Sequence, residues 1–393
     1  MTPTKPLPQG HVAVPPWRDI RVLRVLGQLA ILGTLALLVA AFGAIFVGNI
    51  ASTRLTFSLG FLGQTSGMEL AQTPISYNST DTFARAFAVG VINTLLVSAI
   101  GVVLATVLGI VVGVARLSNN WLASRISARF VEVMRNTPLL VQLVLIAALM
   151  RQLPGVADAI ELPGSVFISS RGVYIPRPEA AAGFAPWFAL VVASIAAGVA
   201  LNLVSARRRD AGQRTFALGR AGLAVALGVP VVGWLALSPF AFDLPALNGF
   251  NFTGGVAVST AFTALLIGLV IYTAAFIGEV VRGGIQAVRH GQVEAAYSIG
   301  LTRGQTLRLV VFPQALRVIV PPLTSQYLNL IKNSSLAVAV GYADIFLVGR
   351  AMANQTSQPL SVILLVMGTY LAISLLVSLV MNAYNRRVQV LER

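Results

Sequence analysis

The sequence predicts an all-α polytopic integral membrane protein with about eight transmembrane helices. Of its 393 residues, 56% are apolar and only 10% are charged, whereas soluble proteins carry roughly a quarter charged residues. The chain contains no cysteine, so disulfides and cysteine-based metal sites are excluded. Its apolar residues gather in runs near the length of about 20 residues that a helix needs to cross a bilayer. These observations exclude disordered and collagenous classes and argue against a soluble enzyme.

Six apolar runs are strong span candidates and two are weaker. The strong candidates are Val25–Gly48, Ala86–Ala115, Phe184–Ser205, Ala221–Phe240, Val258–Val281 and Val362–Ala383. The weaker ones are Pro138–Met150, which is short, and Gln314–Ile331, which contains Pro321 and Pro322. A polar tail, 1–24, precedes the first span, 25–48, and a second tail, 385–393, follows the last. The first span is longer than the apolar core of a signal peptide, so we expect it to be retained.

The basic residues supply an orientation. With both termini in the cytoplasm, 21 of the 28 basic residues lie on the inner side, as the positive-inside rule requires. Omitting Pro138–Met150 would place neighbouring arginine blocks on opposite sides, so this short span is kept. Because the charges flank apolar runs, the net charge of +15 indicates membrane orientation and no nucleic-acid partner. The outer connections, roughly 49–85, 151–183, 241–257 and 333–359, are expected to be solvated and too short for a domain.

The sequence gives no sign of catalysis. A nucleotide-binding loop needs a lysine preceded by glycine and followed by serine or threonine, and the two lysines, Lys5 and Lys332, follow Thr4 and Ile331. The two histidines, His11 and His290, lie in polar flanks, and no metal site is expected. We therefore predict no enzyme activity and no cofactor in this chain.

The cytoplasmic loop at 283–313 is the most informative stretch. A first short helix is expected at about Gln292–Ile299, with Glu294 near its positive N-terminal end. Ala295 and Ala296 are small enough for a partner surface to approach closely. Gly300 supplies the backbone freedom that ends a helix.

A second short helix is expected after Gly300. Thr302 and Gln305 have capping-box spacing, and Pro313 is expected to end the helix. Its apolar face consists of Leu307, Val310 and Val311. Such a helical pair suits docking into a groove on another protein, or lying on lipid, which Arg303 and Arg308 would favour. The residues alone leave both interpretations open.

A family resemblance separates these alternatives. The loop resembles the EAA loop of bacterial ABC import permeases in Glu294, Ala295, Ala296, Gly300, Phe312 and Pro313. The family pattern usually ends in Leu-Pro, so Phe312 departs from it while keeping a large apolar side chain. In that family the loop is the coupling helix, seated in a cleft of a separate ATPase subunit.

Other segments resemble the polar amino-acid branch of that family (histidine, glutamine and arginine permeases). They are Asn93-Thr94-Leu95, the run Arg135–Gln142, the group Glu279, Arg282, Gly283, Gly284 and Ile285, and the run Lys332–Leu336. The inserted helix pair at about 184–240 and the overall length are most similar to the larger permease of a general L-amino-acid importer.

The resemblance implies a type I ABC importer permease fold, with a five-helix core and extra helices within 86–384. It also implies a bacterial inner-membrane location, a pair of ATPase subunits that bind ATP and Mg, a homologous second permease chain as heterodimer partner, and a periplasmic amino-acid-binding protein. The remaining alternatives are an ion-coupled secondary transporter acting without an ATPase and a structural membrane subunit without a pathway. No convincing inverted repeat supports the former.

Polar residues at membrane depth are candidates for the translocation path, because unpaired charges in hydrocarbon are costly. Pro321 and Pro322 are expected to break the seventh span, and Ser325, Gln326 and Asn329 follow at helical spacing, either as path residues or as a polar packing seam. Gln142 in the short span is a similar candidate. Glu279 and Arg282 can pair at i,i+3, which favours a structural ion pair over substrate contact.

Overall fold

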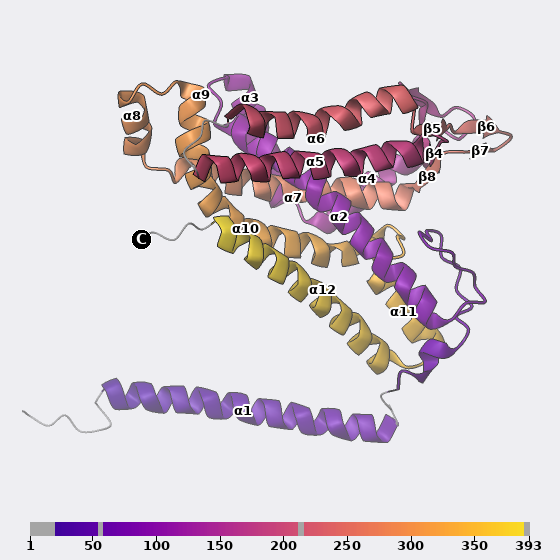
Figure 1. Ribbon diagram of the computed structural model, residues 1–393. Coiled ribbons are helices and arrows are strands. Elements are labelled where there is room, and N and C mark those ends of the chain that lie inside the picture. Colours follow the sequence, from indigo (N-terminus) through magenta and orange to yellow (C-terminus); the bar gives the residue numbers. More distant parts are fainter. Residues whose placement is uncertain (1–19, 54–57, 211–215, 389–393) are drawn as a thin grey trace, which may run out of the picture.

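The computed structural model describes residues 20–53, 58–210 and 216–388, and Figure 1 shows that helices dominate them. The long helices are α1 (Ile20–Thr53), α2 (Phe83–Arg116), α3 (Trp121–Asn136), α4 (Leu139–Arg151), α5 (Phe184–Asp210), α6 (Phe216–Leu237), α7 (Thr260–Gln286), α10 (Phe312–Asn333), α11 (Ile345–Thr356) and α12 (Pro359–Val388). The shorter ones are η1 (Gly60–Gly63), α8 (His290–Ser298), α9 (Arg303–Thr306), the π-helical turn η2 (Leu307–Val311) and η3 (Ser334–Ala339).

The predicted number of spans is confirmed. Among the described residues, seven helical segments are long and apolar enough to cross a membrane, and the bent pair α3 and α4 brings the number to eight. This pair turns by 106°, so the short apolar run at Pro138–Met150 continues α3 around an elbow. Most of the predicted N-terminal tail, 1–24, and part of the C-terminal tail, 385–393, lie outside the described residues.

The prolines of the seventh span do not interrupt it. The helical path from Arg303 to Ala339 is unbroken, so the expected stop at Pro313 and the expected break at Pro321 and Pro322 are wrong. Pro313 lies in the first turn of α10, directly after η2. A proline ring clashes with the carbonyl four residues before it, and a π-turn at that place widens the helix. Pro321 and Pro322 each lack a backbone N–H donor, and a helix packed among neighbouring helices tolerates the loss of these two hydrogen bonds.

The core forms where α2 and α7 pack at very short range. Gly109 and Gly113 of α2 face α7, and a Cβ atom on Gly113 would lie 2.6 Å from the carbonyl oxygen of Gly278. Small residues four apart allow such close helix contacts in membranes. The buried core that results extends to α4 through Leu143 and to α10 through Leu330. α1, by contrast, has no buried share in its span and lies apart from the bundle in Figure 1.

The outer connections are more ordered than expected. The connections near 151–183 and 241–257 form eight short strands, of which β1, β4 and β6 are exposed along their whole length: β1 (Ile160–Leu162), β2 (Val166–Ser169), β3 (Gly172–Ile175), β4 (Arg177–Ala180), β5 (Phe240–Asp243), β6 (Ala246–Asn248), β7 (Asn251–Thr253) and β8 (Val256–Ser259). A four-stranded antiparallel sheet has the order β1-β2-β3-β8. The strands themselves were not predicted, because the many Gly and Pro residues interrupt strands that are only three or four residues long.

The inserted pair α5 and α6 forms a closed hairpin. β4 precedes α5, β5 follows α6, and the two strands pair at that end of the hairpin, with Arg177 opposite Asp243. Inside the hairpin, Trp187 donates a hydrogen bond to the carbonyl oxygen of Pro230 at 3.0 Å. The two helices pack chiefly on each other. The insertion therefore adds a self-contained unit to the remaining spans.

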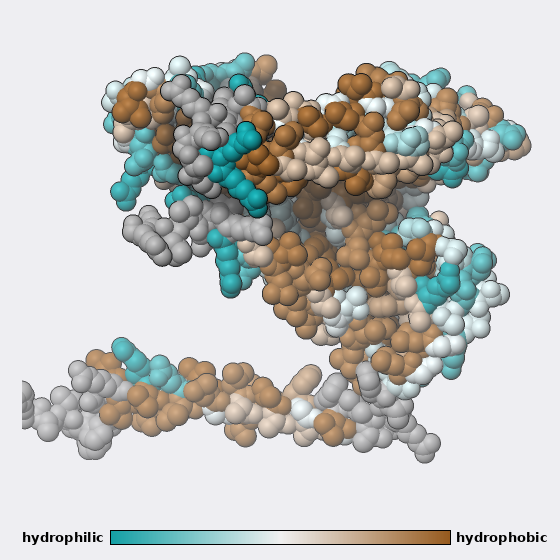
Figure 2. Space-filling view, viewed as in Figure 1, coloured by the Kyte–Doolittle hydropathy of each residue, from teal (hydrophilic) through white to brown (hydrophobic). Residues whose placement is uncertain are grey.

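Polar and apolar surfaces are separated along the bundle. Figure 2 shows apolar side chains over the middle of the helices and polar ones gathered toward the two ends. In Figure 1, α8, α9 and the C-terminal end of α12 lie at one end, and the strands and α11 lie at the other. This distribution is the one that a lipid bilayer around the middle of the helices would select.

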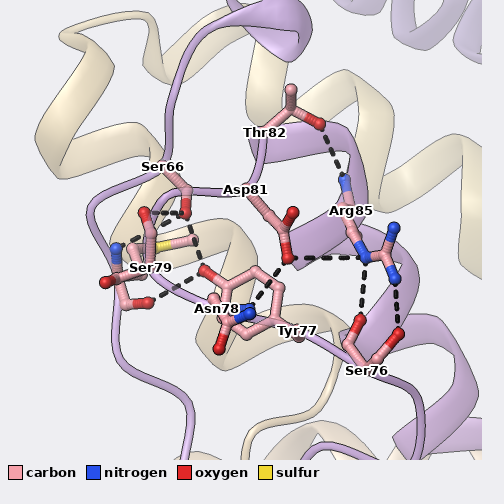
Figure 3. A network of polar contacts seen from close by, with 9 residues as sticks. Ser66, Ser76, Tyr77, Asn78, Ser79, Asp81, Thr82 and Arg85 are labelled. Atoms are coloured by element: carbon pink, nitrogen blue, oxygen red, sulfur yellow. Dashed lines mark hydrogen bonds and ion pairs between the residues drawn. The ribbon is translucent and has the colours of Figure 1, made fainter.

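The segment before α2 is held by a polar network (Figure 3). Arg85 donates from Nε to the carbonyl oxygen of Ser76 at 2.8 Å, and Asp81 Oδ2 accepts from the backbone N–H of Asn78 at 2.8 Å. Tyr77 donates to the carbonyl oxygen of Met68 at 2.9 Å. The segment is therefore held in place over the N-terminal end of α2.

Candidate functional site

The predicted cytoplasmic loop is a helix–turn–helix. α8 carries Glu294 and Ala295 on its exposed side, whereas Ala296 is buried. The carboxylate of Glu294 lies 2.9 Å from Nδ1 of His290, one turn earlier. Both side chains remain exposed, at 67% and 86%, so the pair leaves the carboxylate of Glu294 accessible to a partner.

Gly300 ends α8 in the way the sequence predicts. Its φ of +83° lies in the left-handed region, which a residue without Cβ adopts most easily. Its N–H donates to the carbonyl oxygen of Tyr297, and the N–H of Leu301 donates to that of Ala296. These two bonds form a Schellman motif. A Cβ atom at Gly300 would meet nothing within 4 Å, so a substitution there would strain only the backbone.

The second half of the loop leads directly into the membrane. Thr302 caps α9, and Gln305 returns a side-chain bond to complete the predicted capping box. The apolar face predicted for the second short helix is only partly exposed, because Val311 is buried and Leu307 is 49% exposed. The exposed large apolar side chains of the loop, called the loop patch below, are Tyr297, Ile299, Leu307, Leu309 and Phe312. Pro313 is exposed beside them.

The predicted pair of Glu279 and Arg282 is present and belongs to a larger cluster. Arg282 donates to Oε1 of Glu279, with Nε at 3.2 Å. The other carboxylate oxygen pairs with Arg116, at the end of α2. Arg282 also donates from Nη1 to Gln286 at 2.5 Å. Sequence reasoning missed Arg116 because 163 positions separate it from Glu279.

A polar cavity lies between α7 and α10. Its volume is about 250 Å³, and it is lined by Tyr272, Thr273, Phe276, Gln326, Asn329 and Asn333. Two of the predicted path residues, Gln326 and Asn329, therefore share one cavity, and Asn333 continues the same face of α10. Ser325 is not among the lining residues. Thr273 lies midway along α7, which places this cavity near the middle of the span.

Gln142 does not line that cavity. Its side chain is buried, and its Nε2 donates to the carbonyl oxygens of Met134 and Thr137, each at 3.0 Å. Both acceptors belong to the C-terminal end of α3, where helix carbonyls otherwise lack partners. Gln142 therefore holds the elbow between α3 and α4.

A second polar cluster, absent from the sequence predictions, joins α2 to α11 and α12. Asn93 donates from Nδ2 to the carbonyl oxygen of Ala343 at 2.8 Å, and Thr94 accepts from the backbone N–H of Ile345 at 3.1 Å. Asp344 caps α11 by accepting from the N–H of Leu347 at 2.8 Å. Burial raises the pKa of Asp344 from its ordinary 3.8 to about 6. In the sequence, the signal for this cluster was one acid, Asp344, within an apolar run.

No metal centre is formed by the part of the chain that the structure describes: no group of three or more His, Cys, Asp or Glu side chains there could hold an ion. The site consists of a docking-type loop and a polar cavity, which the long helix beginning at Arg303 connects, and of an ion-pair cluster on α2 and α7.

Comparison with known proteins decides the family. Residues 105–390, most of the chain, match the family model of the inner membrane component of binding-protein-dependent transport systems. The chain belongs to this family. Membership in this family does not favour the alternative function, that of an ion-coupled secondary transporter acting without an ATPase. Permeases of this family are not themselves catalytic. Family membership and the long apolar helices together show that the chain is a multi-pass membrane protein.

Curated relatives share most of the chain. YhdX of Escherichia coli, named as an amino-acid ABC transporter permease, is 44% identical over 353 residues, which cover 88% of this chain and 89% of YhdX. AapQ of Rhizobium johnstonii, a general L-amino acid transport system permease, is 40% identical and covers 88% and 87% of the two chains. BztB of Rhodobacter capsulatus, from a glutamate/glutamine/aspartate/asparagine transport system, is also 40% identical, with 88% coverage of each.

Proposed function

We propose that this chain is the permease subunit of an ATP-driven ABC importer for L-amino acids. It forms one wall of the translocation path and is coupled to a separate ATPase by the loop at 283–313. The proposal places the chain in the bacterial inner membrane, with α8, α9 and both termini in the cytoplasm. ATP and Mg belong to the partner ATPase.

One observation carries the mechanism: the loop and the cavity are joined by continuous helix. The chain enters this helix at Arg303, passes through η2, and reaches Gln326 and Asn329 in α10 without a break. From Phe312 to Gln326 the helix rises about 21 Å. Because a helix resists bending, a displacement of the loop by a docked partner is transmitted to the cavity wall.

The loop offers a fitting surface for a partner. The loop patch exposes aromatic and aliphatic side chains beside Glu294, and Ile299 is 77% exposed. An apolar patch rimmed by charges at the polar end of the molecule suits an amphipathic helix seated in a groove of another protein. Closure of an ATPase pair on ATP would then draw the loop toward the partner.

Other subunits complete the assembly. One chain presents one such loop, so a pair of ATPases implies a second permease chain with its own loop. The polar cavity is open on the side that α7 and α10 leave uncovered, and Asn329 is exposed there. The second permease would close it. A periplasmic amino-acid-binding protein would deliver substrate at the end that carries the strands.

Charge reversal and backbone strain in the loop test this proposal. Glu294→Lys and Gly300→Asp should each abolish ATP-dependent uptake of labelled L-amino acids while the protein remains in the membrane at normal abundance. Glu161→Lys reverses an exposed acid on β1, and Gly249→Asp places the same side chain on a glycine with φ of +60° and open space. Both controls lie at the other end and should transport normally. Normal uptake in both loop variants would contradict the coupling role.

A further inference from the structure

Two cavities follow one another along α7. The first is the polar cavity of about 250 Å³ described above. The second, called the inner crevice below, has a volume of about 500 Å³ and is lined by Arg116, Ala128, Val131, Glu132, Arg135, Asn136, Phe276 and Glu279. Only Phe276 belongs to both linings. Its ring is therefore the side chain that lies between them.

The order of residues along α7 places this ring on the way to the cytoplasmic end. α7 begins at the strands and ends at the loop that precedes α8. Thr273 lines the polar cavity, and Glu279 lines the inner crevice. Phe276 lies between these two residues, three positions or about 4.5 Å of helix from each. The crevice is therefore the inward continuation of the polar cavity past one apolar ring.

The ring is held from two sides. The guanidinium carbon of Arg135 lies 5.2 Å from the centre of the Phe276 ring, within the range of a cation–π contact. The Tyr272 ring lies 4.9 Å away on the same helix. Arg135 belongs to the last turn of α3, directly before the elbow that Gln142 secures. The position of α3 therefore determines whether Arg135 stays on the ring.

We propose that the Phe276 ring is the inner barrier of the translocation path and that Arg135 holds this ring in the closed position. This inference rests on the proposed function and adds the place at which the path is closed. An apolar ring across a polar route obstructs a zwitterion, because the zwitterion would lose its hydration there without gaining partners. A shift of α3 relative to α7 removes Arg135 from the ring and lets the half-buried side chain turn aside.

The absence of cysteine from the chain permits a direct test with single cysteines. Asn329→Cys places a thiol in the polar cavity, and Ala128→Cys places one in the inner crevice. The assembled complex is studied without ATP in inverted membrane vesicles, which expose the cytoplasmic face to a charged, membrane-impermeant methanethiosulfonate. With Phe276 present, Ala128→Cys should react rapidly and Asn329→Cys slowly.

Removing the ring should open the polar cavity to the reagent. Adding Phe276→Ala should make Asn329→Cys react about tenfold faster or more, as expected when a barrier is lowered, without changing the reaction of Ala128→Cys. Phe262→Ala removes a similarly half-buried ring from the outer part of α7 and should leave both rates unchanged. Arg135→Gln keeps the Phe276 ring but removes the cation that holds it, so Asn329→Cys should react at an intermediate rate.

The outcomes separate this inference from the proposed function. If the complex drives ATP-dependent uptake but Asn329→Cys reacts equally in the Phe276 and Phe276→Ala proteins, the barrier assignment is overturned and the importer assignment stands. If the complex with Phe276 shows no ATP-dependent uptake, the proposed function itself fails. Should Phe276→Ala not reach the membrane, Phe276→Leu carries the same test, with a smaller acceleration expected and an unchanged rate counting against the barrier.

Discussion

Tyr370 of α12 donates a hydrogen bond to Oδ2 of Asp344 at 3.0 Å. The acceptor is buried, and its other oxygen caps α11. This bond ties the last span to the N-terminus of α11, and Thr94 ties α2 to the same place by accepting from the backbone N–H of Ile345. The Asp344 side chain thus joins α11 to α12, and the adjacent Thr94 bond adds α2, at the end of the molecule that carries the strands.

The raised pKa of Asp344 predicts a pH dependence of stability. The pKa is about 6 in the folded chain against an ordinary 3.8, chiefly because of burial. Between these values the folded state binds more protons than the unfolded state, so stability falls as pH rises through this window and levels off above it. Asp344→Asn should remove that part of the pH dependence.

Thermal unfolding of the detergent-solubilised complex between about pH 4 and about pH 7 measures this effect. The comparison variant is Asp158→Asn, which changes an exposed acid just before β1 and should have the same pH profile as the unaltered protein. If the unaltered protein and Asp344→Asn have the same dependence of unfolding temperature on pH, the Asp344 carboxyl has the same pKa in the folded and unfolded states, which would contradict the prediction.

Loss of Arg116 should destabilise the protein more than loss of an exposed arginine. Arg116→Ala leaves Glu279 with one of its two cations in a cluster whose side chains are 20% and 28% exposed. We expect a cost of about 1 to 2 kcal/mol in the free energy of unfolding, because a partly buried carboxylate loses compensation. Arg129→Ala, whose pair with Glu132 is exposed, should cost less than about 0.5 kcal/mol. Equal losses in denaturant unfolding would contradict the structural role of the cluster.

Gln142 separates a structural role from a path role. Gln142→Met keeps the length of the side chain but leaves the carbonyl oxygens of Met134 and Thr137 without this donor, at a cost of about 1 to 3 kcal/mol. The expected result is a lower unfolding temperature with an unchanged KM for transported amino acids. Gln152→Met, at an exposed position, serves as the control. A changed KM at normal stability would instead indicate substrate contact.

The spans could be predicted because hydropathy and arginine placement are local properties. Even the short run at Pro138–Met150 was recovered, through the charges on either side of it. The capping box of Thr302 and the left-handed Gly300 were also predictable, since both depend on neighbouring residues. Arg116 was missed because Glu279 is distant in sequence. Asp344 was missed because one acid in an apolar run does not identify Tyr370, its partner on another helix. The continuous helix through Pro321 and Pro322 depends on packing that a proline pair does not reveal.

Reconstitution tests the central claim most directly. The chain is purified with its ATPase and partner permease, placed in proteoliposomes with a binding protein, and supplied with labelled L-amino acid and internal ATP. We predict vanadate-sensitive uptake that ceases with Gly300→Asp in this chain and continues with Gly249→Asp. Uptake that follows an ion gradient without ATP, or that persists with Gly300→Asp, would contradict the account.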